Sequence, residues 1–208
     1  MDYLRDPEQI YRASFAAVRR AVDLDGVPEA LHPIVLRLVH AGGRPEIVAA
    51  LRWSGDPAGA ARAALAQGAP VIVDATMVAA GITESRLPAR SRVLCTLRDN
   101  RVPHLARQHR TTRSAAAVDL WLPDLAGAVV AIGNAPTALF RLLERLQDPD
   151  TPPPAALFAF PVGFIGAAES KAALIAAGTA VPYLTLTGRE GGSALAAAAV
   201  NAAAQGAE

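Results

Sequence analysis

His40 is the residue of this sequence best placed to move a proton, because of the helix that it ends. It follows the apolar run Ile34-Val35-Leu36, typical of a buried helix face, and it precedes Ala41-Gly42-Gly43, typical of a helix end. A helix C-terminus favours a positive charge by roughly 0.3–2 kcal/mol. An imidazolium at this position could therefore donate a proton to a ligand, and a histidine that only packs or caps is the alternative.

The other three histidines have less distinctive surroundings. His32 precedes Pro33 at a helix start, where we expect a solvated side chain. His104 and His109 lie in the polar stretch 100–110, which predicts a surface segment or a mobile flap. Because no cluster rich in His, Cys or acidic residues accompanies any of the four, we expect no metal site.

Glycine-containing turns follow three of the expected strands and lead into helices, at 133–137, 161–171 and 188–193. Backbone N–H groups at such helix starts point toward an anion. Arg98 and Arg189 also follow strands, and their planar guanidinium groups pair bidentately with carboxylates. We therefore expect an anionic ligand with several carboxylates. Glycines that merely permit tight turns are the alternative.

Two common classes of enzyme lack their motifs here. There is no Gly-x-x-x-x-Gly-Lys-Ser/Thr or Gly-x-Gly-x-x-Gly pattern, which argues against a nucleotide site. Neither Ser14 nor Ser114 lies in Gly-x-Ser-x-Gly, so a hydrolase nucleophile is not supported. Thr111 to Ser114 is typical of a helix N-cap, and Arg113 just inside that helix could reach a ligand carboxylate.

The positions of these residues depend on a predicted α/β fold. Short apolar runs that are continuous rather than alternating predict strands covered on both faces, at 70–74, 93–96, 128–132, 156–160 and 182–186. Helices are expected between and after them, at 112–122, 136–147, 167–177 and 193–204, and before them at 7–22, 28–40 and 57–67. Alternation of strands and helices predicts a parallel sheet with right-handed crossovers.

Composition places the chain among single-domain globular proteins. Its 208 residues are 52% hydrophobic and 19% charged, and the net charge of +1 does not suggest a nucleic-acid partner. The single cysteine, Cys95, excludes an internal disulfide and is expected in a strand. The first residues have no signal core and no run is long enough to span a membrane, so we expect a cytoplasmic protein.

Several stretches together resemble precorrin-8X methylmutase, a family of cobalamin (vitamin B12) biosynthesis. The most specific are Ala131-Ile132-Gly133-Asn134-Ala135-Pro136-Thr137-Ala138-Leu139, Pro161-Val162-Gly163-Phe164-Ile165-Gly166-Ala167-Ala168-Glu169-Ser170-Lys171 and Gly188-Arg189-Glu190-Gly191-Gly192-Ser193. Shorter matches are Tyr11-Arg12-Ala13-Ser14-Phe15, Val39-His40-Ala41-Gly42-Gly43, Gly68 to Asp74, Thr96-Leu97-Arg98-Asp99 and Thr112-Arg113-Ser114-Ala115-Ala116. The resemblance covers essentially the whole chain.

The resemblance implies a fold and a reaction. The fold is a flavodoxin-like three-layer αβα sandwich with a five-stranded parallel sheet and extra N-terminal helices, forming one domain over residues 1–208. The reaction moves a methyl group from C-11 to C-12 of precorrin-8X to give hydrogenobyrinate, a corrin, or acts on cobalt-precorrin-8 in the cobalt-early pathway. It needs no cofactor. A corrinoid carrier without strong catalysis is the alternative function.

The resemblance also implies roles for residues and a partner. His40 corresponds to the family's acid, and Ser14 and Arg113 should lie close to it. The remaining residues expected to bind substrate are Arg98, Thr112, Asn134, Gly163, Lys171, Arg189, Gly192 and Ser193. Because few residues are aromatic, we expect Leu, Val, Ala and Met77 against the macrocycle faces. The family's active site resembles a cleft shared between subunits, which implies a homodimer.

Overall fold

A six-stranded sheet lies at the centre of the computed structural model, which describes residue 1, residues 3–88 and residues 90–205. The strands are β1 (Leu51–Ser54), β2 (Val71–Val73), β3 (Val93–Leu94), β4 (Val129–Ile132), β5 (Ala156–Ala159) and β6 (Tyr183–Leu186). Their order across the sheet is β1-β6-β5-β4-β2-β3. Neighbouring strands are parallel except for β1, which pairs antiparallel with β6.

The five strands expected from the sequence are confirmed as β2 to β6, but the prediction of a five-stranded, wholly parallel sheet is wrong. Strand β1 was not expected from the sequence, and it is an edge strand in which Leu51 is buried while Arg52 is exposed. Such a strand has no continuous apolar run, because one of its sides has no neighbouring strand and part of its surface faces water. Strand β3 is also shorter than expected, and Cys95 lies one residue beyond its end.

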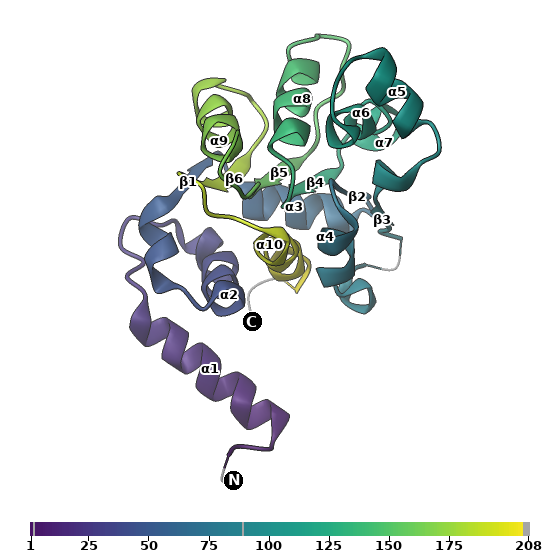
Figure 1. The fold of residues 1–208 in the computed structure, drawn as a ribbon. Coiled ribbons are helices and arrows are strands. Elements are labelled where there is room, and N and C mark those ends of the chain that lie inside the picture. The colour runs from purple at the N-terminus through teal and green to yellow at the C-terminus, as the bar shows by residue number, and fades with distance from the viewer. Residues whose placement is uncertain (2, 89, 206–208) are drawn as a thin grey trace.

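Helices cover both faces of the sheet, so the molecule has three layers (Figure 1). On one face, α10 (Ser193–Gln205) packs against α2 (His32–Gly42), α3 (Pro57–Ala66) and α4 (Thr76–Gly81). On the other face, α8 (Pro136–Leu146) packs between α6 (Arg113–Val118) and α9 (Ala167–Ala176). The short helices α5 (Val102–Gln108) and α7 (Leu122–Leu125) extend the second layer near the β3 edge.

The two helical layers enclose separate apolar cores. Alternate strand residues point to opposite faces, so Val71 and Val129 join the core under α10, while Ile72 and Val130 join the core under α8. The alanine-rich sequence of α10 allows it to approach its neighbours closely. A Cβ atom added to Gly81 would lie 2.7 Å from the Cβ of Ala197. Small side chains at this contact are therefore a packing requirement.

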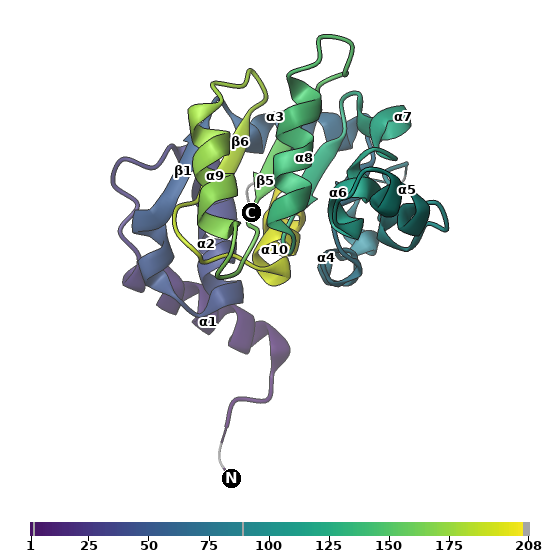
Figure 2. The same ribbon diagram turned by 45° about the horizontal axis from the view of Figure 1, so that its top comes forward.

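The N-terminal helix α1 (Pro7–Ala21) projects away from the sheet in both views of the ribbon (Figures 1 and 2). Asp6 caps it, accepting a hydrogen bond from Gln9 N at 2.9 Å, and Phe15 is the residue that it buries. Ile10 and Tyr11 are exposed. The helix therefore contacts the body along one narrow stripe and leaves most of its surface uncovered.

Most predicted helices are confirmed, with corrections at particular residues. The segment 28–40 is a 3-10 turn (Glu29–Leu31) followed by α2, whose C-cap residue is Gly43 with φ +63°. The segment 112–122 is not one helix, because Pro123 lacks an N–H and can only stand in the first turn of a new helix, α7. Helix α4 was not expected, and α5 lies in the stretch predicted as surface or flap.

No helix within the described ranges is both long and apolar enough to cross a membrane.

Candidate active site at the carboxyl edge of the sheet

His40 and Ser14 form a direct contact between two helices. His40 lies in the last turn of α2, and its Nδ1 atom is 2.9 Å from the Oγ atom of Ser14 on α1. The ring of Phe15 stacks on the imidazole with centroids 4.8 Å apart and an interplanar angle of 23°. Since Ser14 occupies Nδ1, Nε2 is the nitrogen left for a ligand. His40 is exposed, so this nitrogen belongs to an accessible ring.

The end of the helix that carries His40 is fixed to the loop that follows β6. Arg44, just after α2, forms an ion pair with Glu190 at 2.6 Å. The backbone carbonyl of Glu190 in turn accepts a hydrogen bond from Nζ of Lys171 on α9. In the same loop, Arg189 lies over the ring of Phe164, 5.2 Å from its centroid. The loop 188–192 therefore has contacts to the segment just after α2, to α9 and to the loop after β5.

Lys171 was expected to contact substrate, but its position does not agree with direct contact. The residue is 0% exposed and its ammonium group bonds to the Glu190 carbonyl. Burial lowers the pKa of Lys171 to about 8, and the negative charge of Glu190 opposes that shift. The side chain therefore supports the loop that carries Arg189 from inside the protein.

Asp74 is a buried residue whose role the sequence analysis did not identify. It follows β2 directly, and its carboxylate accepts hydrogen bonds from Gly133 N at 2.9 Å, Asn134 N at 3.0 Å and Ala135 N at 2.6 Å. Burial raises the pKa of Asp74, and these three N–H bonds oppose the rise. An acid placed immediately after the first parallel strand was the signal that could have revealed it.

The glycine turns do not offer their N–H groups to a ligand in the way that we expected. Besides the amides held by Asp74, Gly192 N donates to the Phe160 carbonyl at 2.7 Å, and Gly163 N donates to the Arg189 carbonyl at 3.2 Å. These five donors are satisfied within the chain. Ligand carboxylates at this edge would therefore have to be met mainly by arginine side chains.

Arg113 and Thr112 lie at the other end of the same edge. Thr112 caps α6, as predicted, and its Oγ1 atom is 2.8 Å from Oγ1 of Thr137 at the start of α8. Arg113 donates to the Leu97 carbonyl at 3.4 Å, beside the exposed Arg98. Within the described residues, no hydrogen bond or ion pair joins Arg113 to His40, and the proximity expected of these two residues stays a prediction.

The start of α10 lies between these two ends of the edge. A Cβ atom added to Gly133 would lie 2.7 Å from the Cα of Ser193, and one added to Gly42 would lie 3.5 Å from the Leu195 side chain. The first turn of α10 thus contacts both the turn after β4 and the end of α2. These contacts connect the elements that carry several of the expected site residues. Those residues are Ser14, Asn134, Gly163, Arg189, Gly192 and Ser193.

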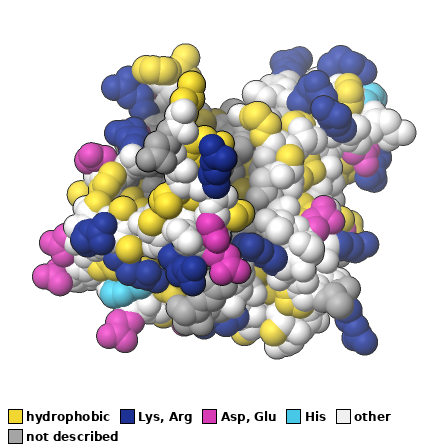
Figure 3. Space-filling view, turned by 90° about the horizontal axis from the view of Figure 1, so that it is seen from below, with side chains coloured by type: hydrophobic (Ala, Val, Ile, Leu, Met, Phe, Trp, Pro, Cys, Tyr) yellow, Lys and Arg dark blue, Asp and Glu magenta, His cyan; other side chains and the backbone are white. Residues whose placement is uncertain are grey.

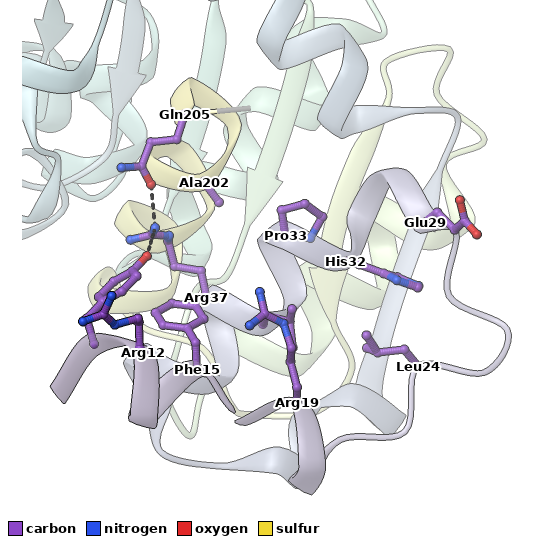
Figure 4. Close-up of a pocket in the computed structure, with 12 residues that line it drawn as sticks. Arg12, Phe15, Arg19, Leu24, Glu29, His32, Pro33, Arg37, Ala202 and Gln205 are labelled. Carbon is purple, nitrogen blue, oxygen red and sulfur yellow. Dashed lines mark hydrogen bonds between the residues drawn. The ribbon is translucent and has the colours of Figure 1, made fainter. Parts of the chain in front are cut away.

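A cavity of about 560 Å³ lies between α1, α2 and α10, and His40 is not among the residues that line it (Figure 4). Phe15 forms part of its wall, and the same ring stacks on the imidazole of His40. Arg37 donates to Gln205 Oε1 at 2.5 Å and to the Tyr11 hydroxyl at 3.0 Å, and Arg12 and Arg19 line the same space. The volume falls in the range of small-molecule sites, roughly 300–1,000 Å³.

Exposed apolar side chains accompany the arginines. Phe164 is 85% exposed and Ile165 is 91% exposed in the loop after β5, and Met77 is 62% exposed at the start of α4. The expectation that Met77 is available to a macrocycle agrees with this exposure. Phe164 is an aromatic residue that the low aromatic content led us to overlook.

The remaining histidines and the cysteine have local partners or open surroundings. His32 is half-buried, contrary to expectation, and its Nε2 donates to the Val27 carbonyl at 2.9 Å. His104 is exposed, and His109 lies 3.3 Å from Asp119. Burial raises the pKa of the Cys95 thiol, which argues against a nucleophile. In the part of the chain that the structure describes, no three His, Cys, Asp or Glu residues are grouped to hold a metal.

These features define an α/β protein with a candidate ligand site at the carboxyl edge of a mostly parallel sheet. The family model described as precorrin-8X methylmutase matches residues 9–205. Curated proteins named precorrin-8X methylmutase are 54% identical in Pseudomonas aeruginosa, covering 97% of both chains, and 52% identical in Sinorhizobium sp., covering 98% of this chain and 97% of the relative. A crystal structure of the Thermus thermophilus precorrin-8X methylmutase superposes with a TM-score of 0.85 at 35% identity, covering 95% of this chain and 94% of that one.

The chain belongs to the precorrin-8X methylmutase family.

Proposed function

We propose that this protein is an isomerase that moves a methyl group from C-11 to C-12 of precorrin-8X, giving the corrin hydrogenobyrinate, with His40 as general acid. The observation that carries the proposal is the contact between Ser14 Oγ and His40 Nδ1, in a chain that belongs to this family over nearly its whole length. The similarity to relatives named for precorrin-8X supports the metal-free substrate.

The chemistry requires little more than an acid and a shaped cavity. A methyl shift within one molecule has no leaving group and changes no oxidation state overall. A proton or strong hydrogen bond on a ring nitrogen would draw electron density from the π system and ease the migration. The Nε2 atom of His40 would supply that proton, while the Ser14 oxygen accepts a hydrogen bond from Nδ1–H and stabilises the imidazolium.

Both the acid and the binding of the macrocycle must contribute to the rate enhancement. General acid catalysis contributes typically about 10²–10⁴-fold, or roughly 3–5 kcal/mol. The rest of the rate enhancement must come from holding the macrocycle in the conformation in which the methyl group can migrate. We assign this to the apolar residues Phe164, Ile165 and Met77, which are exposed at the carboxyl edge.

We assign the acetate and propionate arms of the substrate to Arg98, Arg113 and Arg189. All three side chains are exposed. The backbone N–H groups of the 133–135 turn at the same edge already donate to Asp74, so they do not compete for these carboxylates. Guanidinium groups suit this task because each can pair with a carboxylate through two hydrogen bonds. Thr112, Asn134, Gly163, Gly192 and Ser193 remain proposed substrate neighbours on the same edge, whereas Lys171 would act through the loop that it supports.

We propose a homodimer in which the two chains share each active site. Two observations support it. Helix α1, which carries Ser14, projects from the body with Ile10 and Tyr11 exposed (Figure 2). In addition, no hydrogen bond or ion pair joins Arg113 to His40 among the described residues of one chain, so a second copy could bring these residues together. Sedimentation equilibrium would test the dimer. If the two chains share each site, mixing an inactive variant at Arg113 with an inactive variant at His40 should restore part of the activity.

The five parallel strands support a flavodoxin-like arrangement. Their order, β3-β2-β4-β5-β6, corresponds to 2-1-3-4-5 when they are numbered from β2. The connections change direction between β2 and β4, where Asp74 contacts the turn after β4. Ligands of such sheets bind at the carboxyl ends of the strands near this point, which agrees with the site that we propose.

The proposal is tested by incubating precorrin-8X with the purified protein and recording the visible spectrum and the mass of the product. We expect the spectrum to change to that of a corrin while the mass stays constant, because the methyl group moves within the molecule. A bound ligand whose spectrum never becomes that of the corrin would favour the carrier instead. Conversion of cobalt-precorrin-8 but not of precorrin-8X would correct the substrate.

A further inference from the structure

The surface near the β3 edge carries much more positive charge than the rest of the molecule. Residues 98–113, which we call the basic lobe, contain five arginines and one acid and have a formal charge of +4, with His neutral. The whole chain carries +1, so the other residues together carry −3. Figure 3 shows several basic side chains gathered at its right-hand end, the side on which α5 lies in Figure 1.

The positive charge of the basic lobe is largely available to solvent. Arg101 bonds the one acid, Asp99, through both carboxylate oxygens at 2.9 and 2.8 Å. The other four arginines, which are Arg98, Arg107, Arg110 and Arg113, are exposed. None of these four forms an ion pair with any residue that the structure describes.

The lobe is held in place, so its charges have a fixed position. Val102 and Ala106 of α5 pack on Ala116 and Ala117 of α6 in a small apolar cluster of their own. Behind α6, the carboxylate of Asp119 accepts hydrogen bonds from Arg141 and Arg145 of α8, at 2.8 Å from each Nε. Burial raises the pKa of Asp119, but these two arginines outweigh it and hold that pKa below its ordinary value.

The lobe borders the edge of the sheet at which we place the substrate. The contact between Thr112 and Thr137 joins it to the start of α8, beside the turn after β4. The positive electrostatic potential of the lobe would attract a ligand with several carboxylate arms as it approaches this edge, before any contact forms. Fixed charge of one sign at the entrance to a site raises association rates by about 10–10³-fold, and the effect weakens as salt is added.

We propose that the basic lobe is a steering surface for a polycarboxylate macrocycle, and that Arg107 and Arg110 accelerate association without touching the bound ligand. The proposal rests on the proposed function, because precorrin-8X and its corrin product have the carboxylate arms that the lobe would attract. The roles of Arg98 and Arg113 are different, since these two also lie where they can pair with the bound ligand.

The test measures association and dissociation rates of hydrogenobyrinate by stopped-flow absorbance, over a series of NaCl concentrations. The variant is Arg107→Glu, at an exposed position in the last turn of α5. The matched control is Arg62→Glu on α3, which changes the net charge equally at another exposed position. Circular dichroism of each variant checks that it is folded.

We expect Arg107→Glu to slow association about three- to tenfold at low salt, with a dissociation rate within about twofold of wild type. The difference should vanish at high salt, and Arg62→Glu should behave as wild type. Equal slowing by both variants would attribute the effect to net charge and overturn the proposal. A change confined to the dissociation rate would also overturn it, because it would mean direct contact.

The steering role and the proposed function can fail separately. If the wild-type protein binds the corrin and converts precorrin-8X, but Arg107→Glu associates at the wild-type rate at every salt concentration, steering alone is wrong. If the wild-type protein neither binds the corrin nor converts precorrin-8X, both the steering role and the proposed function are wrong.

Discussion

The Oγ atom of Ser14 lies 2.9 Å from the Nδ1 atom of His40, although 26 residues separate them in the sequence. The contact exists because α1 packs against α2, with Phe15 buried between them and stacked on the imidazole. Ser14 and Phe15, which are adjacent in the sequence, thereby fix one side of the histidine, while its Nε2 atom has no hydrogen-bond partner among the residues that the structure describes. This is the geometry of an acid whose orientation is set before a ligand arrives.

Removing the Ser14 hydroxyl should weaken the acid without preventing folding. We expect Ser14→Ala to lower kcat about ten- to a hundredfold with a smaller change in KM, since a hydrogen bond to a charged group contributes about 1.5–3 kcal/mol. Steady-state rates of corrin formation measure this. Ser85→Ala, at an exposed position in a 3-10 turn, is the matched control. An unchanged kcat in Ser14→Ala would show that the contact has no part in catalysis.

Replacing Lys171 with methionine should change how stability depends on pH. The pKa of Lys171 is lowered to about 8, so between pH 8 and its ordinary value of 10.5 the unfolded chain binds more protons than the folded chain. Stability therefore rises with pH through this window. We expect the free energy of unfolding of the wild type to increase by about 1–2 kcal/mol relative to Lys171→Met between pH 7.5 and 9.5.

Urea unfolding at several pH values provides the comparison for Lys171. Parallel pH profiles for the two proteins would mean that Lys171 titrates as in an unfolded chain. The same variant should also raise KM, because the loop that carries Arg189 loses its contact with α9.

Asp74→Asn should destabilise the protein despite its similar shape. An asparagine presents one oxygen and one NH₂ group, so at least one of the three N–H donors of the 133–135 turn would face another donor. Leaving a buried donor unsatisfied costs about 1–3 kcal/mol, which corresponds to a fall in Tm of about 3–10 °C at this size.

Asp56→Asn is the matched control for Asp74. Asp56 caps α3 by accepting from Gly59 N at 2.8 Å, and asparagine caps helices as well as aspartate does. Its Tm should stay within about 1 °C of wild type on that basis. Equal Tm values for all three proteins would refute the role that we give to Asp74.

Asp119→Asn should loosen α6 from α8. The carboxylate accepts from Arg141 and Arg145 and is mostly buried, so its loss leaves Arg145 without an anionic partner and Arg141 with Glu144 alone, and should cost about 3 kcal/mol. Because the pKa of Asp119 is below its ordinary value, this stabilisation is present above about pH 4 and is lost as pH falls through the lowered pKa.

Hydrogen exchange and urea unfolding at pH 7 and below pH 3 would check the prediction for Asp119. We expect faster exchange in α5 and α6 of the variant at pH 7, and a difference in stability that closes in acid. A difference that is the same at both pH values would contradict the ionic explanation.

Sequence patterns predicted the parts of this structure that depend on local periodicity. The runs at β2 and β4 to β6 are apolar on both faces, and the end of α2 has the Gly43 that a left-handed helix terminus needs. The pattern failed at β1, where Arg52 and Ser54 are not buried, because an edge strand depends on pairing with β6 rather than on its own apolarity.

The sequence singled out those residues of the candidate site that a local pattern or a family resemblance marks. His40 stood out through its helix, and Ser14 through a resemblance, but the stacking of Phe15 and the bond from Lys171 to Glu190 depend on how separate elements pack. The occupied amides of the glycine turns could not be foreseen either. Their partners, Asp74 and Phe160, directly follow other strands, β2 and β5.

The most direct test of the central claim is a single-turnover experiment with precorrin-8X and two proteins, the wild type and His40→Ala. Visible absorbance reports conversion to the corrin, and quenching of tryptophan fluorescence reports binding. We predict that His40→Ala binds substrate within about threefold of wild type but converts it about 10²–10⁴ times more slowly. Conversion by His40→Ala at the wild-type rate would contradict the assignment of His40 as the acid.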